Sequence, residues 1–273
     1  MIKNLAWVST ICFILSNVNL VAQSINTTQK AKGFNEELLI DIEGDTISAY
    51  ALISKGHLKK QTAIIIKGYP GNDSNFDLAH KLRSVGINTI LFDHRGAWGS
   101  QGKYLYSNCL KDVVHVIDHL TEPEVSENLR IDTSNFILIG RSLGGGVALI
   151  SGSRIPKVKK IIGISNVNYG DLMQEYSQVS ELIHFSRYMK KQIMMNHDIN
   201  DFLEELILNK AKFNISNYSS ELSLKKVLLI EDSNKNDRWI KQLNNLEVVY
   251  LDSDHNFTNQ RNVMIEEILN WIK

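Results

Sequence analysis

The sequence predicts an α/β fold built on a mainly parallel sheet with helices on both of its faces. Short apolar runs rich in β-branched residues recur along the chain, as is typical of strands buried on both faces. Segments with apolar residues at helical spacing lie between them. With 273 residues, of which 43% are hydrophobic, the chain can bury one large core, and we expect one domain over residues 38–273.

The N-terminus has the layout of a secretory signal peptide. A lysine at position 3 precedes an apolar stretch from about Leu5 to Leu15, and Ala22 offers a cleavage site. The stretch is short and is followed by asparagines, which disfavours a membrane span. We therefore expect a signal peptide over residues 1–22, a linker over residues 23–37, a secreted or periplasmic protein, and no membrane span after signal removal. An uncleaved N-terminal anchor is the alternative.

The charge balance, the cysteines and the absence of certain motifs limit which classes of partner and cofactor are expected. Thirty basic residues balance thirty acidic ones, so no net field attracts nucleic acid or an anionic bilayer, and a small-molecule substrate is expected. Cys12 would leave with the signal, so Cys109 alone cannot form an internal disulfide. The sequence contains no spacing of metal ligands and no nucleotide-binding glycine motif, so neither a metal nor another cofactor is expected.

The chain begins with a predicted antiparallel hairpin and continues with alternating strands and helices. Residues 38–42 and 47–53 form the hairpin around a Glu-Gly-Asp turn. Six further strands are predicted at residues 63–66, 89–92, 136–139, 161–164, 227–230 and 248–251. Helices are predicted at roughly residues 76–85, 108–120, 143–153 and 258–272. In the second helix, residues 110, 113, 114, 117 and 120 are apolar at helical spacing.

Residues 168–224 interrupt this alternation. The segment has no clear strand and carries helical stretches rich in large apolar side chains: Phe185, Tyr188, Met189, Ile193, Met194, Met195, Phe202, Leu203 and Leu206. A long insertion before the last strands is typical of a functional element, so we predict a helical cap over the active site. The alternative is that these side chains simply pack on the body of the domain.

The strongest chemical motif is Gly140-Arg141-Ser142-Leu143-Gly144, which directly follows a predicted strand and precedes an apolar helix. Gly-x-Ser-x-Gly in this context is typical of a nucleophile elbow, in which the serine hydroxyl is held out above the sheet. A purely structural glycine turn is the alternative. The oxyanion that such a serine generates needs two backbone donors, and we predict Leu143 and Tyr69. A plain turn at the end of the strand is the alternative for the segment around Tyr69.

Two motifs suggest a family. The segment Lys67-Gly-Tyr-Pro-Gly-Asn72 and the segment Asp93-His-Arg-Gly-Ala-Trp-Gly-Ser100, followed by the elbow, resemble a group of α/β-hydrolases. The first motif of that group reads His-Gly-(Phe/Tyr)-Pro-Gly-Asn, as in dienelactone hydrolases and prolyl-oligopeptidase-like catalytic domains. The resemblance implies an α/β-hydrolase fold and a serine hydrolase. Lys67 stands where the group has a histidine that supports the loop, which puts the geometry of the oxyanion loop in question.

The remaining triad members follow Ser142 in the order acid, then histidine. His255 lies just after the last predicted strand and resembles the family histidine in its Asp-His-x-Phe context, whereas His184 and His197 lie in the cap with an ordinary solvated role expected. The acid is expected in the loop after residue 230. We predict Asp237 because it lies toward the tip of this loop, and Asp232 is the alternative.

Together these features predict an exported serine hydrolase. A carboxylic-ester hydrolase acting on a small, partly apolar ester or acyl substrate is favoured, since the elbow and an apolar cap suit such chemistry. A thioesterase or small peptidase uses the same tetrahedral oxyanion and is a variant of this hypothesis. The alternative from another class is a non-catalytic α/β-hydrolase scaffold that binds a ligand or partner through its cap.

Overall fold

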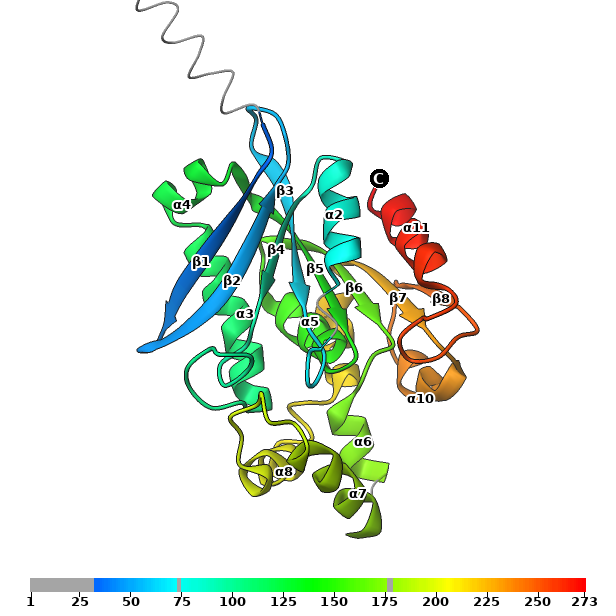
Figure 1. Cartoon of the computed structure of the whole chain (residues 1–273). Coiled ribbons are helices and arrows are strands. Elements are labelled where there is room, and N and C mark those ends of the chain that lie inside the picture. The colour runs from blue at the N-terminus through cyan, green and yellow to red at the C-terminus, as the bar shows by residue number, and fades with distance from the viewer. Residues whose placement is uncertain (1–31, 73–74, 176–178) are drawn as a thin grey trace, which may run out of the picture.

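The structure, a computed structural model, describes residues 32–72, 75–175 and 179–273 (Figure 1). The predicted signal peptide, Cys12 and most of the predicted linker lie outside these ranges. The described chain forms an eight-stranded sheet in the order β1-β2-β4-β3-β5-β6-β7-β8. Its strands are β1 Phe34–Ile42, β2 Asp45–Ile53, β3 Lys60–Ile66, β4 Asn88–Phe92, β5 Ile131–Arg141, β6 Val158–Ile164, β7 Lys226–Glu231 and β8 Glu247–Tyr250.

The sheet is antiparallel at one edge and parallel elsewhere. The predicted hairpin is present as β1 and β2, and β2 also runs antiparallel to β4. From β4 to β8 every neighbouring pair is parallel. All five residues of β4 are buried, the polar Asn88 and Thr89 included, as expected for a strand covered on both faces.

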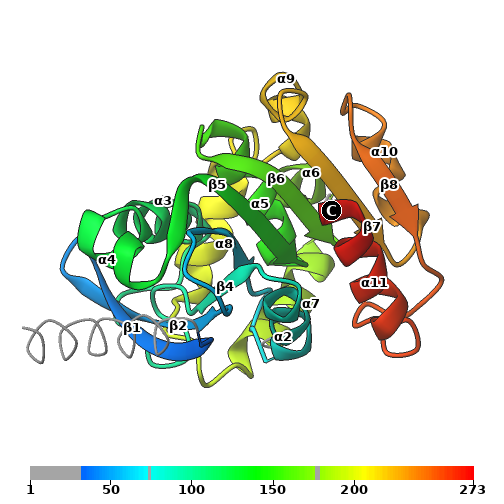
Figure 2. The same cartoon turned by 90° about the horizontal axis from the view of Figure 1, so that it is seen from above.

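Helices cover both faces of the sheet (Figure 2). On one face, α3 Tyr106–Leu120 and α5 Leu143–Arg154 pack on a large apolar cluster. On the other face, α2 Phe76–Ser84 and α11 Arg261–Ile272 close a second cluster. Two further short helices are α4 Pro123–Asn128 and α10 Asp237–Ile240. The predicted α/β fold with a mainly parallel sheet is therefore confirmed.

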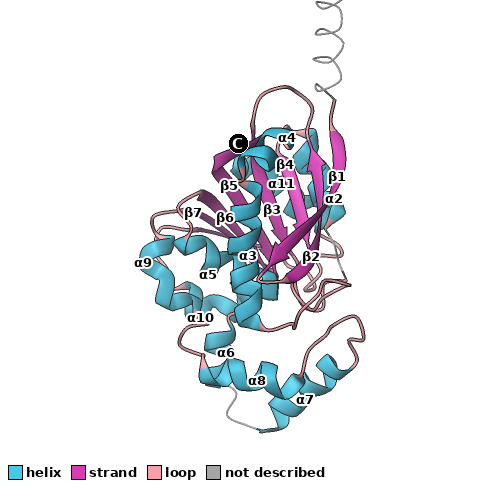
Figure 3. Cartoon of the chain, turned by 90° about the vertical axis from the view of Figure 1, so that its left-hand side faces the viewer, coloured by secondary structure: helices cyan, strands magenta, loops and turns pink. Residues whose placement is uncertain are grey.

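Helices also occupy the segment between β6 and β7 (Figure 3). They are α6 Tyr169–Glu175, α7 Val179–Lys190, α8 Ile199–Leu208, the 3₁₀ turn Ile215–Tyr218 and α9 Ser219–Leu222. In Figure 1, α6, α7 and α8 lie beyond the carboxyl ends of the parallel strands. Ligand sites of α/β sheets lie at this end of the strands.

The helical segment between β6 and β7, called the cap below, is held to the rest of the domain by backbone hydrogen bonds. Ala97 and Met195 form an isolated antiparallel bridge between the loop after β4 and the cap. The Trp98 amide donates to the Met194 carbonyl at 3.0 Å, and the Asn196 amide donates to the Gly96 carbonyl at 2.7 Å. These hydrogen bonds fix the cap segment against the loop that the sequence motif Asp93–Ser100 forms.

The apolar cap residues divide between packing and exposure. Met189, Met195, Phe202 and Leu206 are buried in the larger core cluster, as the packing alternative predicts. Ile193 is 91% exposed. Tyr188 is 46% exposed, and its ring lies edge-on to Tyr69 with the ring centroids 5.9 Å apart.

Several elements have bounds other than the predicted ones; β5, for example, begins at Ile131 and not at residue 136. Strand β1 begins at Phe34, inside the predicted linker, because residues 34–37 continue the antiparallel register with β2. Asp237, expected in an open loop, instead begins helix α10. This last difference bears directly on the site.

Candidate active site

Ser142 occupies a strained turn between β5 and α5. Its backbone has φ 56° and ψ −122°, a conformation that residues other than glycine rarely adopt. A Cβ at Gly144 would collide with the carbonyls of Ile66 and Lys67, so only glycine permits the helix to approach β3 this closely. Strain held by such packing is typical of a functional residue, and this geometry is that of a nucleophile elbow.

The two predicted oxyanion donors flank the serine. Leu143 is the first residue of α5, where a backbone N–H has no acceptor within the helix and the helix dipole is positive. Gly68 precedes Tyr69, and a Cβ on Gly68 would lie 3.1 Å from Cβ and 3.7 Å from Oγ of Ser142. The Tyr69 loop therefore runs directly beside the serine.

Three contacts hold the Tyr69 loop. The indole N–H of Trp98 donates to the Pro70 carbonyl at 2.6 Å. The Tyr69 hydroxyl lies 2.9 Å from Nε2 of His197 in the cap, so His197 is bound to the loop and does not have the solvated role expected from the sequence. Lys67 donates to Asp93 at 2.6 Å, so its ammonium ties the loop to the end of β4.

His255 reaches the same end of the sheet from the loop between β8 and α11. Phe257, two residues on, is fully buried in the second core cluster and anchors this loop. Arg141, adjacent to the serine, donates to the His255 carbonyl at 3.2 Å and to Oδ1 of Asn256 at 2.7 Å. The elbow and the histidine loop are thus joined directly by one guanidinium.

The structure pairs His255 with Asp232 and not with Asp237. Nδ1 of His255 lies 3.4 Å from Oδ2 of Asp232. Asp237 faces elsewhere: its carboxylate accepts from the Tyr250 hydroxyl at 2.5 Å and pairs with Lys241 at 3.1 Å. The structure therefore does not bring the predicted acid Asp237 to His255, because α10 starts at this residue and its side chain contacts Tyr250 of β8 instead.

Ser165, directly after β6, completes the contacts of the imidazole. Its hydroxyl lies 3.0 Å from Nδ1 of His255. Its backbone has φ 46°, and its amide donates to the Ile230 carbonyl at 2.7 Å, which fixes its position beside the end of β7. Ser165 and Asp232 therefore meet the same ring nitrogen from two neighbouring strands.

The surroundings shift the pKa of both partners. Burial lowers the pKa of His255, and the charges of Lys235 and Arg141 lower it further against the opposing effect of Asp232. Burial raises the pKa of Asp232, but hydrogen bonds from Lys235 and Ser165 more than offset this, so its pKa lies below the usual value. The pair is consequently a neutral imidazole beside an ionised carboxylate at neutral pH.

Glu231 lies buried beneath this pair. Its carboxylate accepts from the side-chain amides of Asn166 at 2.6 Å and Asn236 at 2.7 Å. Burial raises its pKa to about 7, despite these hydrogen bonds. Glu231 thereby connects the end of β6 to the loop that carries Asp232.

Ser142 and His255 line one cavity of about 530 Å³ together with Gly68, Tyr69, Pro70, Gly71, Asn72, Arg141, Tyr188 and Asn256. Tyr188 is a contribution of the cap. Among the lining residues that the structure describes, none is acidic, and Arg141 is the formal cation. Within the described ranges, no three His, Cys, Asp or Glu side chains converge as metal ligands do.

Sequence reasoning missed three residues of this site. In the sequence, Arg141 is only the variable position of the elbow, Trp98 is only part of a motif, and no motif includes Ser165. Ser165 carries a usable signal, since it follows the strand next to the elbow strand, and such strand ends meet at one edge of the sheet. Cys109 is fully buried, which raises its thiol pKa well above the usual value and disfavours a nucleophilic role.

The sheet order, the strained serine and the histidine at the last strand define an α/β hydrolase. A family model described as "Serine aminopeptidase, S33" matches residues 60–221, which is more than half of the chain. The chain belongs to this family. One curated relative is the α/β hydrolase domain-containing protein WAV2 of Arabidopsis thaliana, 33% identical over 94 residues, which are 32% of this chain and 29% of that protein.

Solved structures share the fold over most of the chain. Est1E from Butyrivibrio proteoclasticus has a TM-score of 0.65 at 15% identity and covers 86% of this chain and 98% of its own. The α/β hydrolase domain-containing protein 10 from mouse has a TM-score of 0.64 at 19% identity, over 87% of this chain and 98% of its own. The esterase EaEST from Exiguobacterium antarcticum has a TM-score of 0.60 at 16% identity, over 87% and 99%.

Across the described residues, no helix is both long and apolar enough to cross a bilayer.

Proposed function

We propose that this chain is a serine hydrolase that cleaves carboxylic esters with a Ser142-His255-Asp232 triad. The carrying observation is that the strained Ser142 and His255 line one cavity while Asp232 faces Nδ1 of that histidine. The order serine, acid, histidine along the chain is that of α/β hydrolases. The fold shared with the esterase EaEST agrees with this proposal.

In the proposed reaction, Nε2 of His255 takes the proton of Ser142 as Oγ attacks the ester carbonyl. The backbone amides of Leu143 and Tyr69 donate to the oxyanion that forms. The C–O bond of the ester then breaks, and the imidazolium returns its proton to the leaving alkoxide. A water molecule, deprotonated by the same histidine, hydrolyses the acyl-serine to the carboxylic acid and regenerates Ser142.

Asp232 and Ser165 have positioning roles in this scheme. Asp232 keeps Nδ1 protonated, so that Nε2 is free to accept the serine proton, and it stabilises the imidazolium. Ser165 offers a second acceptor to Nδ1 and donates to Asp232. The imidazole is thereby held from two sides.

The cavity favours an ester over a peptide with a free amino terminus. An aminopeptidase must bind the α-ammonium group of its substrate, which calls for a carboxylate beside the scissile bond. The described lining offers the guanidinium of Arg141 and no carboxylate. A neutral or anionic acyl group is therefore the better match.

Lys67 is the main departure from the motif, and it motivates the non-catalytic alternative. Its ammonium is bound by Asp93 at 2.6 Å and is about 15% exposed. In this position it supports the loop that bears Tyr69, as the family histidine is expected to do. The lysine at position 67 is therefore consistent with a loop that is held by an ion pair to Asp93, and it does not argue against catalysis.

The deciding experiment is labelling with a fluorophosphonate, followed by mass spectrometry and a substrate panel. The expected result is an adduct on Ser142 that Ser142→Ala abolishes, with hydrolysis of p-nitrophenyl esters and none of aminoacyl p-nitroanilides. Folded protein that neither forms the adduct nor hydrolyses any substrate would favour the non-catalytic scaffold. Cleavage of the anilides alone would favour a peptidase.

Export from the cytoplasm is part of the same proposal and rests on the layout of residues 1–22. Intact-mass measurement of the protein from its native host tests it. A chain that begins after Ala22 is expected, and an intact N-terminus would support the anchor alternative.

A further inference from the structure

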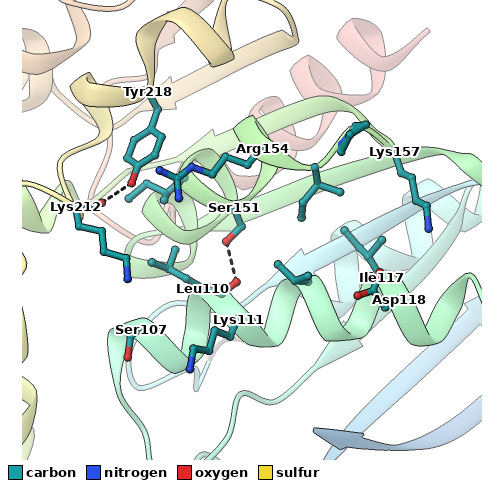
Figure 4. Close-up of a pocket in the computed structure, with 14 residues that line it drawn as sticks. Ser107, Leu110, Lys111, Ile117, Asp118, Ser151, Arg154, Lys157, Lys212 and Tyr218 are labelled. Carbon is teal, nitrogen blue, oxygen red and sulfur yellow. Dashed lines mark hydrogen bonds between the residues drawn. The ribbon is translucent and has the colours of Figure 1, made fainter. Parts of the chain in front are cut away.

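A second cavity of about 530 Å³ lies between α3 and α5, and it shares no lining residue with the Ser142 cavity (Figure 4). Its walls are apolar side chains: Leu110, Val114, Ile117, Ile150, Ile155 and Pro156. On α3 the first three follow each other at helical spacing and continue the stripe that packs on the core. Val114 is nevertheless 41% exposed, so the core leaves this part of the stripe open.

The cavity is strongly polarised by charge. Lys111, Arg154 and Lys212 lie around one end, and Lys157 with Asp118 lies toward the other, as Figure 4 shows. Lys157 donates to the hydroxyl of Thr121, the residue that directly follows α3. The first end therefore carries three cations without an acidic lining residue, whereas the second end is nearly balanced.

The cationic end is ordered by contacts among its own residues. The Arg154 guanidinium stacks over the Tyr218 ring at 4.6 Å, and the Tyr218 hydroxyl donates to the Lys212 carbonyl at 2.7 Å. Two acids lie near this end. Glu205 accepts from the amide of the lining residue Ser107 at 3.3 Å. Glu43 pairs with Arg95 at 2.9 Å and also interacts with Lys111, so the three lining cations outnumber these two acids.

The cavity is also elongated along α3. Ser107 and Asp118, both lining residues on α3, are separated by 11 residues, which corresponds to roughly 16 Å along a helix. An apolar trough of this length with cations at one end is complementary to an extended apolar chain with one anionic head. A volume of about 530 Å³ is in the range of sites for such molecules.

We infer that this groove binds one molecule of a long-chain carboxylate, with its head at Lys111, Arg154 and Lys212 and its alkyl chain along Val114 and Ile117. The carboxylate pairs with the cations, and the chain covers the apolar side chains that the core leaves open. This inference goes beyond the proposed ester hydrolysis and does not depend on it.

Isothermal titration calorimetry of the full chain with monomeric dodecanoate tests the inference. One site per chain is expected, with binding strengthening about fourfold for each added methylene from hexanoate to dodecanoate. Dodecanol and dodecyltrimethylammonium are expected to bind at least tenfold more weakly, since neither provides an anionic head. The Ser142→Ala variant is expected to bind dodecanoate as the parent does.

Two variants with matched controls locate the site. Lys212→Glu is expected to weaken binding about tenfold, whereas Lys55→Glu, an equal charge change at an exposed lysine on another part of the chain, leaves it unchanged. Val114→Asp places a carboxylate in the apolar wall and is expected to abolish binding. Val263→Asp is its control, because Val263 is 40% exposed on α11.

Three results would overturn the inference. The first is equal binding of dodecanoate and dodecyltrimethylammonium. The second is loss of dodecanoate binding when Ser142 is blocked by a fluorophosphonate, which would assign the ligand to the catalytic cavity. The third is binding to vesicles of anionic phospholipid without binding of monomeric dodecanoate, which would identify a membrane contact.

Discussion

The ammonium of Lys235 lies 2.8 Å from the carboxylate of Asp232, the same group that faces Nδ1 of His255. Lys235 therefore competes with the imidazole for the negative charge of Asp232. Partial burial and then the charge of Lys235 lower the pKa of His255 below its usual value. A general base must be neutral, so this arrangement keeps His255 competent at lower pH than an ordinary imidazole.

Replacing Lys235 should shift the pH dependence of catalysis. In Lys235→Met the cation is gone and Asp232 interacts more fully with His255, so the pKa of His255 rises. The neutral form then appears only at higher pH, and the acidic limb of kcat/KM is expected to move upward in pH. Lys241→Met, which removes the partner of Asp237, is the control. An unchanged acidic limb in Lys235→Met would contradict this assignment.

Replacing each aspartate by asparagine tests whether Asp232 or Asp237 is the acid that acts with His255. Asp232→Asn is expected to lower kcat by about 10⁴-fold, the order of loss seen when a triad carboxylate becomes an amide. Asp237→Asn removes only an exposed contact with Tyr250 and Lys241, so near-parental kcat is expected. Steady-state kinetics on a p-nitrophenyl ester decides between them, and a larger loss in Asp237→Asn would restore the sequence-based choice.

The hydrogen bond from Trp98 to the Pro70 carbonyl should matter for catalysis more than for stability. Trp98→Phe keeps an aromatic ring but removes the indole N–H donor, so the Tyr69 loop loosens beside the oxyanion. A fall in kcat on the order of tenfold with little change in KM is expected. Trp271→Phe removes a comparable indole hydrogen bond, to Glu247 at 2.8 Å, far from the site, and should leave kcat unchanged. Equal effects of the two variants would argue against the loop role.

Glu231 should make stability fall as pH rises. Its pKa is about 7 in the folded protein against a usual 4.5, so between these values the folded state holds a proton that the unfolded state releases. The free energy of unfolding is thus expected to decrease by about 3 kcal/mol from pH 4.5 to above pH 7. Urea denaturation across this range measures it. Glu231→Gln should remove this part of the pH dependence, whereas Glu266→Gln, at an exposed residue, should retain it.

Structural features that depend on a short run of consecutive residues could be predicted from the sequence. The buried strands, the helices between them and the elbow around Ser142 each depend on a local pattern, since a strand covered on both faces and a turn between two glycines have their own signatures. The position of His255 was accessible for the same reason, because it follows the last strand and lies beside the buried Phe257.

Only the tertiary structure decided which side chains meet. Asp232 and Asp237 are five residues apart in one loop, and the choice depends on where α10 begins and on the Tyr250 hydroxyl that β8 supplies. Ser165 reaches His255 because β6 and β7 are neighbours. Val114 stays 41% exposed in a groove that residues of α3, α5 and the segment between β6 and β7 line together. Local propensity fixes elements, whereas such contacts between distant residues depend on how those elements pack and on loop conformations that carry no periodic signal.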